Sequence, residues 1–260
     1  MVDPRVIASD GATSTEVSIS ALASRAAGRD VLLATHGFNV SREDGIRSLA
    51  RLEARLRPTA SELFLGVLWP GDFWIPVVNY PSEAADAVEC GVRLARFCDQ
   101  YLRTARSLSF LSHSLGGRVI LEAAANLGRQ PKHVCLTAAA VDWDCLEQQY
   151  AEVVRKAGLI TVLSSRADVV LKLAYPAGDF FSDLFWGDND NPFSAALGRQ
   201  GPRPVAPDGV VPWQIPDDAR YGHGDYLPPS DTNSPPPGQR WEAAADFMAR
   251  AFRGQPQLWP

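Results

Sequence analysis

Ser114 lies in the hexapeptide Ser-His-Ser-Leu-Gly-Gly at 112–117, directly after an apolar run and directly before a helical pattern. This arrangement is typical of the nucleophile elbow, G-x-S-x-G, a sharp strand-to-helix turn that holds a serine in a strained conformation. Gly116 fills the second small position, and Ser112 replaces the first glycine. The helix that follows favours a developing negative charge at its N-terminus. The motif predicts that Ser114 is a nucleophile; the alternative is a serine that only caps a helix.

A second motif, His36-Gly37-Phe38-Asn39, ends another apolar run at 31–35. A glycine there lets the backbone turn so that an amide points toward the space above Ser114. The amides of Phe38 and Leu115 would then form an oxyanion hole for a tetrahedral intermediate. The alternative is an ordinary strand-end turn, and we expect His36 to be a structural hydrogen-bonding residue that holds this loop.

The elements that must position these residues alternate along the chain from residue 30 to residue 174. Short apolar runs predict buried strands at 31–35, 63–69, 107–112, 133–141 and 159–164. Amphipathic stretches predict helices at 41–57, from 81 onward, and at 115–127, 146–157 and 241–252. This alternation predicts an α/β fold, with a mostly parallel central sheet and helices on both faces.

The 260 residues, 46% of them apolar, are expected to form a single domain. Residues 1–30 are weakly defined, with an edge strand expected at 16–20 and a short helix at 21–28. Residues 175–238 are rich in proline, glycine and aromatic side chains, which predicts long loops. Long loops in a compact domain often carry function, for example as a lid.

Composition argues against several kinds of partner. Thirty acidic against 25 basic residues give a net charge of −5, which disfavours nucleic acid. No apolar stretch reaches the roughly 18–20 residues of a membrane span, and the first residues do not form a secretory signal. A cytoplasmic location is therefore expected. No Cys/His spacing fits a zinc site, so no metal is expected. The oligomeric state stays undefined.

The HGFN and SHSLGG motifs and the predicted strand order resemble the α/β-hydrolase superfamily over residues 30–225. Within it, THGFN, the Trp-Pro-Gly at 69–71 and SHSLGGRV resemble a poorly characterised bacterial branch. The resemblance implies the α/β-hydrolase fold and a chain order of nucleophile, acid and histidine. It implies no cofactor and no metal.

Asp168 follows the strand expected at 159–164 by a short turn, which matches the usual acid position of the superfamily. His223 lies in Tyr-Gly-His-Gly-Asp-Tyr at 221–226, and its HxDY pattern resembles the superfamily's histidine loops. The flanking glycines are expected to let the loop approach other backbone closely. His223 would take the Ser114 proton, while Asp168 fixes its tautomer. Asp142 and Asp144, after the preceding strand, are alternative acids.

The other histidines are weaker candidates for a base. His113 adjoins the nucleophile, so its side chain is expected to point away from where Ser114 Oγ needs a base. His133 begins a strand after Pro131 and Lys132, and is expected to be exposed.

Aromatic residues supply the clues to substrate. Trp69, Phe73 and Trp74 follow the second strand, and Phe181 belongs to a cluster after the expected acid. They either border the pocket, which favours a small apolar acyl or aryl ester, or pack the loops onto the sheet. The sequence thus predicts a serine hydrolase that cleaves a carboxylic ester through an acyl-enzyme. Thioester or amide hydrolysis, acyl transfer and a non-catalytic binding protein are alternatives.

Overall fold

The computed structural model describes residues 4–8, 13–70, 80–172, 195–230, 238–255 and 259. Its centre is a six-stranded sheet in the order β4-β3-β5-β6-β7-β8, in which all neighbours are parallel. The strands are β3 (Asp30–Thr35), β4 (Glu62–Val67), β5 (Ser107–His113), β6 (His133–Thr137), β7 (Ile160–Ser164) and β8 (Val210–Gln214). The predicted parallel sheet is confirmed.

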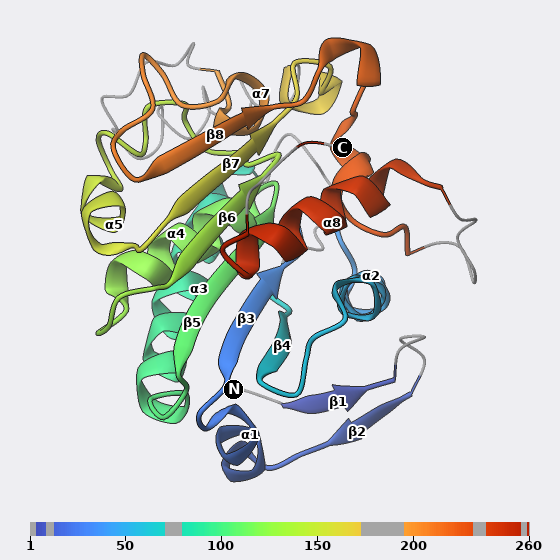
Figure 1. The fold of residues 1–260 in the computed structure, drawn as a ribbon, viewed down its shortest axis with the longest axis vertical. Helices are drawn as coiled ribbons and strands as arrows, with labels where there is room; N and C mark the ends of the chain where they lie inside the picture. The colour runs from blue at the N-terminus through green and yellow to red at the C-terminus, as the bar shows by residue number, and fades with distance from the viewer. Residues whose placement is uncertain are drawn as a thin grey trace.

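Helices cover both faces of this sheet (Figure 1). On one face α2 packs against α8, and on the other α3 packs along α4, which also contacts α5. The longer helices are α2 (Arg42–Leu56), α3 (Tyr80–Tyr101), α4 (Gly116–Asn126) and α8 (Arg240–Phe252). The shorter ones are α1 (Ile19–Ala26), α5 (Ala151–Lys156), α7 (Leu197–Gln200), η1 (Asp217–Ala219) and η2 (His223–Tyr226).

The strand order reverses between β3 and β5. From β3 the chain crosses by α2 to β4 at one edge, then returns by α3 past β3 to β5 and continues through β6 and β7. Because crossovers are right-handed, this reversal puts α2 on one face and the next two long helices, α3 and α4, on the other. In open α/β sheets a crevice forms at the carboxyl ends of the strands where the order reverses. Both candidate motifs follow β3 or β5 at that point.

β6 is shorter than predicted. It ends at Thr137, because Ala138 adopts a left-handed backbone conformation (φ 45°) and the chain leaves the sheet. The amide of Ala140 then donates to the carbonyl oxygen of Ser114 at 3.1 Å. Likewise α5 occupies only the last part of the helix expected at 146–157.

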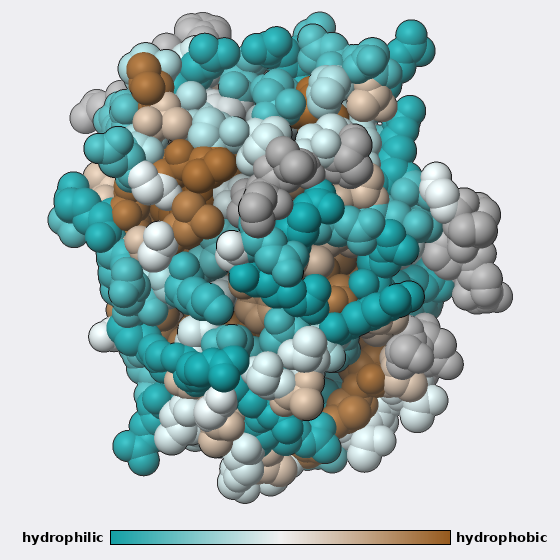
Figure 2. All heavy atoms as spheres, viewed as in Figure 1, coloured by the Kyte–Doolittle hydropathy of each residue, from teal (hydrophilic) through white to brown (hydrophobic). Residues whose placement is uncertain are grey.

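β8 was not predicted, since it falls in the stretch assigned to loops and contains Pro212. The Gly209 carbonyl and the Ile215 amide bond to β7, so by alternation Pro212 directs its nitrogen away from β7. A proline lacks the N–H donor, and this outer side of an edge strand tolerates its loss. In Figure 2, which has the same view as Figure 1, apolar side chains gather on the surface over the β8 side of the sheet. Val211 of β8 is 38% exposed.

The N-terminal segment differs from the expected edge strand at 16–20. β1 (Arg5–Ile7) and β2 (Ser14–Glu16) pair antiparallel in a separate two-stranded sheet. The helix expected at 21–28 is confirmed as α1, two residues earlier at each end. None of the helices in the described ranges is long and apolar enough to cross a membrane.

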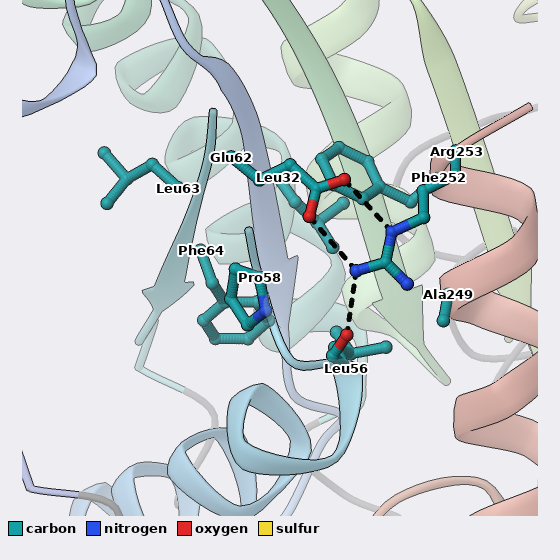
Figure 3. Close-up of a pocket in the computed structure, with 9 residues that line it drawn as sticks. All are labelled: Leu32, Leu56, Pro58, Glu62, Leu63, Phe64, Ala249, Phe252 and Arg253. Carbon is teal, nitrogen blue, oxygen red and sulfur yellow. Dashed lines mark hydrogen bonds and ion pairs between the residues drawn. The ribbon is translucent and has the colours of Figure 1, made fainter. Parts of the chain in front are cut away.

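The C-terminal end of α8 is fixed to β4 and α2 by Arg253. Its Nε lies 3.0 Å from Glu62 Oε1, and it donates to the Leu56 carbonyl at 2.9 Å (Figure 3). The apolar pocket beside this ion pair has a volume of about 10 Å³, which is room for about one water molecule. It is a packing gap, and not a substrate site.

Candidate active site

Ser114 occupies the turn between β5 and α4 with a left-handed backbone (φ 56°). Such a conformation costs a non-glycine residue roughly 1–3 kcal/mol and persists only where its surroundings enforce it. Here the Ser114 amide donates to the Thr137 carbonyl at 3.1 Å, and the Ser114 carbonyl accepts from the Gly117 amide at 2.9 Å. The strained geometry of a nucleophile elbow is therefore held by neighbouring backbone.

The loop after β3 interlocks with this elbow. A Cβ on Gly116 would lie 2.5 Å from Thr35 Oγ1 and would also overlap the His36 carbonyl oxygen. A Cβ on Gly37 would lie 2.8 Å from the Ser114 Cβ. Both glycines are needed because a Cβ at either position would overlap atoms of the facing loop. Ser112, at the first small position of the motif, is fully buried.

His223 lies within hydrogen-bonding distance of both Ser114 and Asp168. Its Nε2 is 2.8 Å from Ser114 Oγ, and its Nδ1 is 2.8 Å from Asp168 Oδ2. Because an ionised carboxylate only accepts, Nδ1–H donates to Asp168 and Nε2 is left to accept from the Ser114 hydroxyl. The order Ser114, His223, Asp168 is the geometry of a nucleophile, a base and an orienting acid.

Asp168 is completely buried at the start of a short helical turn, where its Oδ1 accepts from the Leu171 amide at 2.9 Å. Its carboxylate is the one beside His223. The alternative acids make other contacts: Asp144 Oδ2 accepts from Gln148 at 3.0 Å, and Asp142 forms a β-bridge with Ala196.

The loop that carries His223 is tied to both α8 and the acid loop. Asp225 Oδ2 accepts from the Gly222 amide at 2.7 Å and from Arg240 at 3.0 Å. Tyr221 donates its hydroxyl to the Arg240 carbonyl, while its own carbonyl accepts from Ser165 Oγ at 2.8 Å. The four-residue helix η2 is therefore anchored on two sides.

The expectation about the glycines of this loop was wrong. A Cβ on Gly224 would meet nothing within 4 Å, and one on Gly222 would lie 3.6 Å from Asp225 Oδ2. Neither residue has a positive φ, and a Cβ on either would lie within 4 Å of no described backbone atom beyond its chain neighbours. The loop is positioned by side-chain anchors and not by close backbone packing.

The amides expected to form an oxyanion hole are those of Phe38 and Leu115. Among the described residues, neither the Phe38 nor the Leu115 amide has a hydrogen-bond acceptor, although Leu115 is fully buried. A buried N–H without an acceptor is unusual, because burying it unpaired costs free energy. Amide donors that keep no protein acceptor are suited to bind a developing oxyanion.

His36 braces the loop that carries Phe38. Its Nδ1 donates to the Gly37 carbonyl at 2.8 Å, and its Nε2 lies 3.4 Å from the Trp69 amide, from which it accepts. The Trp69 indole N–H donates to the His36 carbonyl at 3.0 Å, and the two rings stack. Trp69 is 5% exposed.

The other aromatic candidates, Phe73, Trp74 and Phe181, lie outside the described residues.

The two remaining histidines, His133 and His113, are each held by a different hydrogen-bond partner. His133 is 3% exposed, which corrects the expectation of an exposed residue, and its Nε2 lies 2.7 Å from Thr161 Oγ1. His113 Nε2 lies 2.7 Å from the carbonyl oxygen of His223, a contact that spacing along the sequence does not indicate. The side chain of His113 thus contacts the His223 backbone, whereas the His223 ring is the one that bonds Ser114 Oγ.

Residues 11–178, well over half of the chain, match the model of a family described as an alpha/beta hydrolase of unknown function. The chain belongs to this α/β-hydrolase family. The predicted superfamily membership and fold class are confirmed. No curated protein sequence matches this α/β hydrolase.

Solved structures that resemble this α/β hydrolase include esterases of low sequence identity. Carboxyl esterase 2 from Tuber melanosporum is 14% identical, with 86% of this chain and 77% of that one covered and a TM-score of 0.46. An esterase from Pyrobaculum calidifontis is 14% identical, with 88% and 78% covered and a TM-score of 0.43. Esterase B from Lactobacillus rhamnosis is 11% identical, with 87% and 75% covered and a TM-score of 0.43.

Proposed function

We propose that this α/β hydrolase is a serine hydrolase that cleaves a carboxylic ester of a small molecule. The observation that carries the proposal is the hydrogen-bonded series from Ser114 Oγ through His223 to the buried Asp168 carboxylate, each step 2.8 Å long. The strained backbone of Ser114 adds support, as do the Phe38 and Leu115 amides, which have no acceptor within the described part of the chain. No cofactor is needed for this chemistry.

In the proposed acylation step, Ser114 Oγ attacks the ester carbonyl carbon while His223 Nε2 takes the hydroxyl proton. The carbonyl oxygen becomes an oxyanion that accepts from the Phe38 and Leu115 amides. When the intermediate collapses, the C–O bond to the alcohol breaks and the leaving alcohol takes the proton from His223. An acyl group then remains on Ser114.

In the proposed deacylation step, water attacks the acyl carbon and gives a proton to His223. The bond to Ser114 Oγ breaks, His223 returns the proton to that oxygen, and the carboxylic acid leaves. Asp168 stabilises the imidazolium in both steps and keeps the Nδ1 proton pointing at itself. The same residues would serve a thioester, an amide or an acyl acceptor other than water, and esters are the simplest substrates for them.

Phe73, Trp74 and Phe181 are proposed to border an apolar acyl or aryl group, since they follow β4 and Asp168 in the sequence. Trp69 was expected to do the same. Its burial against His36 favours support of the loop that carries Phe38, a distinction that kinetics can make.

Labelling by a fluorophosphonate tests this proposal, because such probes phosphonylate only an activated serine. Intact mass should rise by one adduct in wild type, and the adduct should be absent in Ser114→Ala and His223→Ala. The Ser114→Ala variant should lose ester hydrolysis and keep its unfolding transition. Folded wild-type protein without an adduct, or hydrolysis that survives in Ser114→Ala, would refute the assignment and favour a binding protein.

A further inference from the structure

His113, the last residue of β5, lies against two loops of the candidate site. Its Nε2 lies 2.7 Å from the carbonyl oxygen of His223, and the two rings lie 4.8 Å apart. Its ring also lies 6.0 Å from that of Tyr226, and a Cβ on Gly37 would lie 3.0 Å from its Nδ1. The residue beside the nucleophile thus touches the histidine loop and the loop after β3 together.

The protonation state of His113 follows from its surroundings. Burial lowers its pKa to about 3, and the neighbouring His223 and His36 rings add to this, although the hydrogen bond with the His223 backbone and the charge of Asp168 oppose it. The ring is therefore neutral near pH 7 and carries one N–H. A carbonyl oxygen only accepts, so that proton belongs on Nε2, the nitrogen facing His223.

We propose that His113 is a positioning residue, which donates Nε2–H to the His223 carbonyl and thereby holds the imidazole of His223 against Ser114 Oγ. This inference rests on the proposed serine hydrolase function. The anchors on α8 and on Ser165 hold Tyr221 and Asp225, whereas the bond from His113 holds the backbone of His223 itself. Because a misplacement of about 1 Å can cost roughly 10²-fold in rate, one such bond has a large effect.

Three variants separate the hydrogen bond from the packing of the ring. His113→Phe keeps a ring against His223 and Tyr226 without a donor, and His113→Met is a second donor-free variant that adapts to the space. His113→Gln restores an N–H near the position of Nε2. His133→Phe is the matched control, since His133 is also buried and its ring bonds Thr161 of β7 and no candidate site residue within the described part of the chain.

The measured quantities are the rate constant of fluorophosphonate labelling, kcat and KM for a short-chain aryl ester, and the urea unfolding transition. His113→Phe and His113→Met should label roughly 30- to 100-fold more slowly, with an equal fall in kcat and little change in KM. His113→Gln should stay within about fivefold of wild type. His133→Phe should label at the wild-type rate.

The pH profile of labelling distinguishes positioning from a direct proton-transfer role. In His113→Met or His113→Phe the plateau should fall while the inflection keeps its pH, since His223 still supplies the base. A donor-free variant that folds and labels as fast as wild type would overturn the inference, as would a folded His113→Gln as slow as the donor-free variants. Failure of wild type to label would instead refute the serine hydrolase proposal.

Discussion

Asp168 Oδ2 accepts a hydrogen bond from His223 Nδ1 at 2.8 Å, and the side chain of Asp168 has no exposure to solvent. A buried carboxylate is costly unless its oxygens are paired, and here the Leu171 amide satisfies the other oxygen. The carboxylate is therefore fixed in direction from both sides. The bond to this fixed carboxylate orients the imidazole of His223, so that its Nε2 faces Ser114.

Replacing Asp168 by Asn should lower kcat by roughly 10³- to 10⁴-fold, because the amide nitrogen favours the wrong imidazole tautomer. Steady-state hydrolysis of an aryl ester and the labelling rate both measure this effect. Asp144→Asn is the control, since Asp144 contacts Gln148 and not His223. A larger loss in Asp144→Asn than in Asp168→Asn would contradict the assignment of the acid.

The central sheet could be predicted because its strands are continuous apolar runs separated by helical patterns. β3, β5 and β7 lie within one residue of their predicted bounds for this reason. β8 could not be predicted, since Pro212 is tolerated only where its nitrogen faces away from the neighbouring strand, which is a property of the assembled sheet. The end of β6 depends on packing against the elbow, which no local pattern encodes.

The parts of the candidate site that a short motif with an obligatory glycine defines could be predicted from the sequence. Gly37 and Gly116 lie where the loop after β3 and the elbow are too close for a Cβ. The two motifs that contain these glycines therefore reflect a tertiary contact. The contacts of His113 with the His223 carbonyl, and of Trp69 with His36, join segments distant in the sequence. Neither contact could be predicted from one sequence, because no regular spacing of residues connects the two partners.

Gly116→Ala should lower the free energy of unfolding by about 2 kcal/mol, because the new Cβ would overlap the His36 carbonyl and Thr35 Oγ1. The labelling rate of the folded variant should also fall, since relief of the overlap moves the loop that carries Phe38. Gly224→Ala meets nothing within 4 Å and should change stability by less than about 0.5 kcal/mol. Urea titrations of the two variants measure both values, and equal stability would argue against the interlocked loops.

Trp69→Phe should reduce kcat by roughly tenfold and leave KM nearly unchanged. The reason is that the indole N–H no longer holds the His36 carbonyl, so the Phe38 amide is less well placed for the oxyanion. Kinetics with aryl esters of increasing acyl length test this. A change in KM that grows with acyl length would instead assign Trp69 to the wall of the substrate pocket.

His133 should make the fold sensitive to mild acid. Burial lowers its pKa from 6.5 to about 4, against weaker opposition from a hydrogen bond with the Ala251 backbone. Between these values the unfolded chain binds a proton that the folded protein does not, so stability is lost as pH falls below 6.5 and the loss levels off below about 4. From pH 7 to pH 5 this one residue should cost on the order of 2 kcal/mol.

The test for His133 is the free energy of unfolding in urea at both pH values, compared with His133→Gln. Glutamine stays neutral and can still bond to Thr161, whose Oγ1 lies 2.7 Å from His133 Nε2 in wild type. The variant should therefore lose about 2 kcal/mol less than wild type between pH 7 and pH 5. His113 also lowers the stability of both proteins in acid, because burial lowers its pKa to about 3. This contribution is the same in wild type and variant, so it cancels in the comparison. Parallel declines in wild type and variant would show that His133 is not the source of the acid sensitivity.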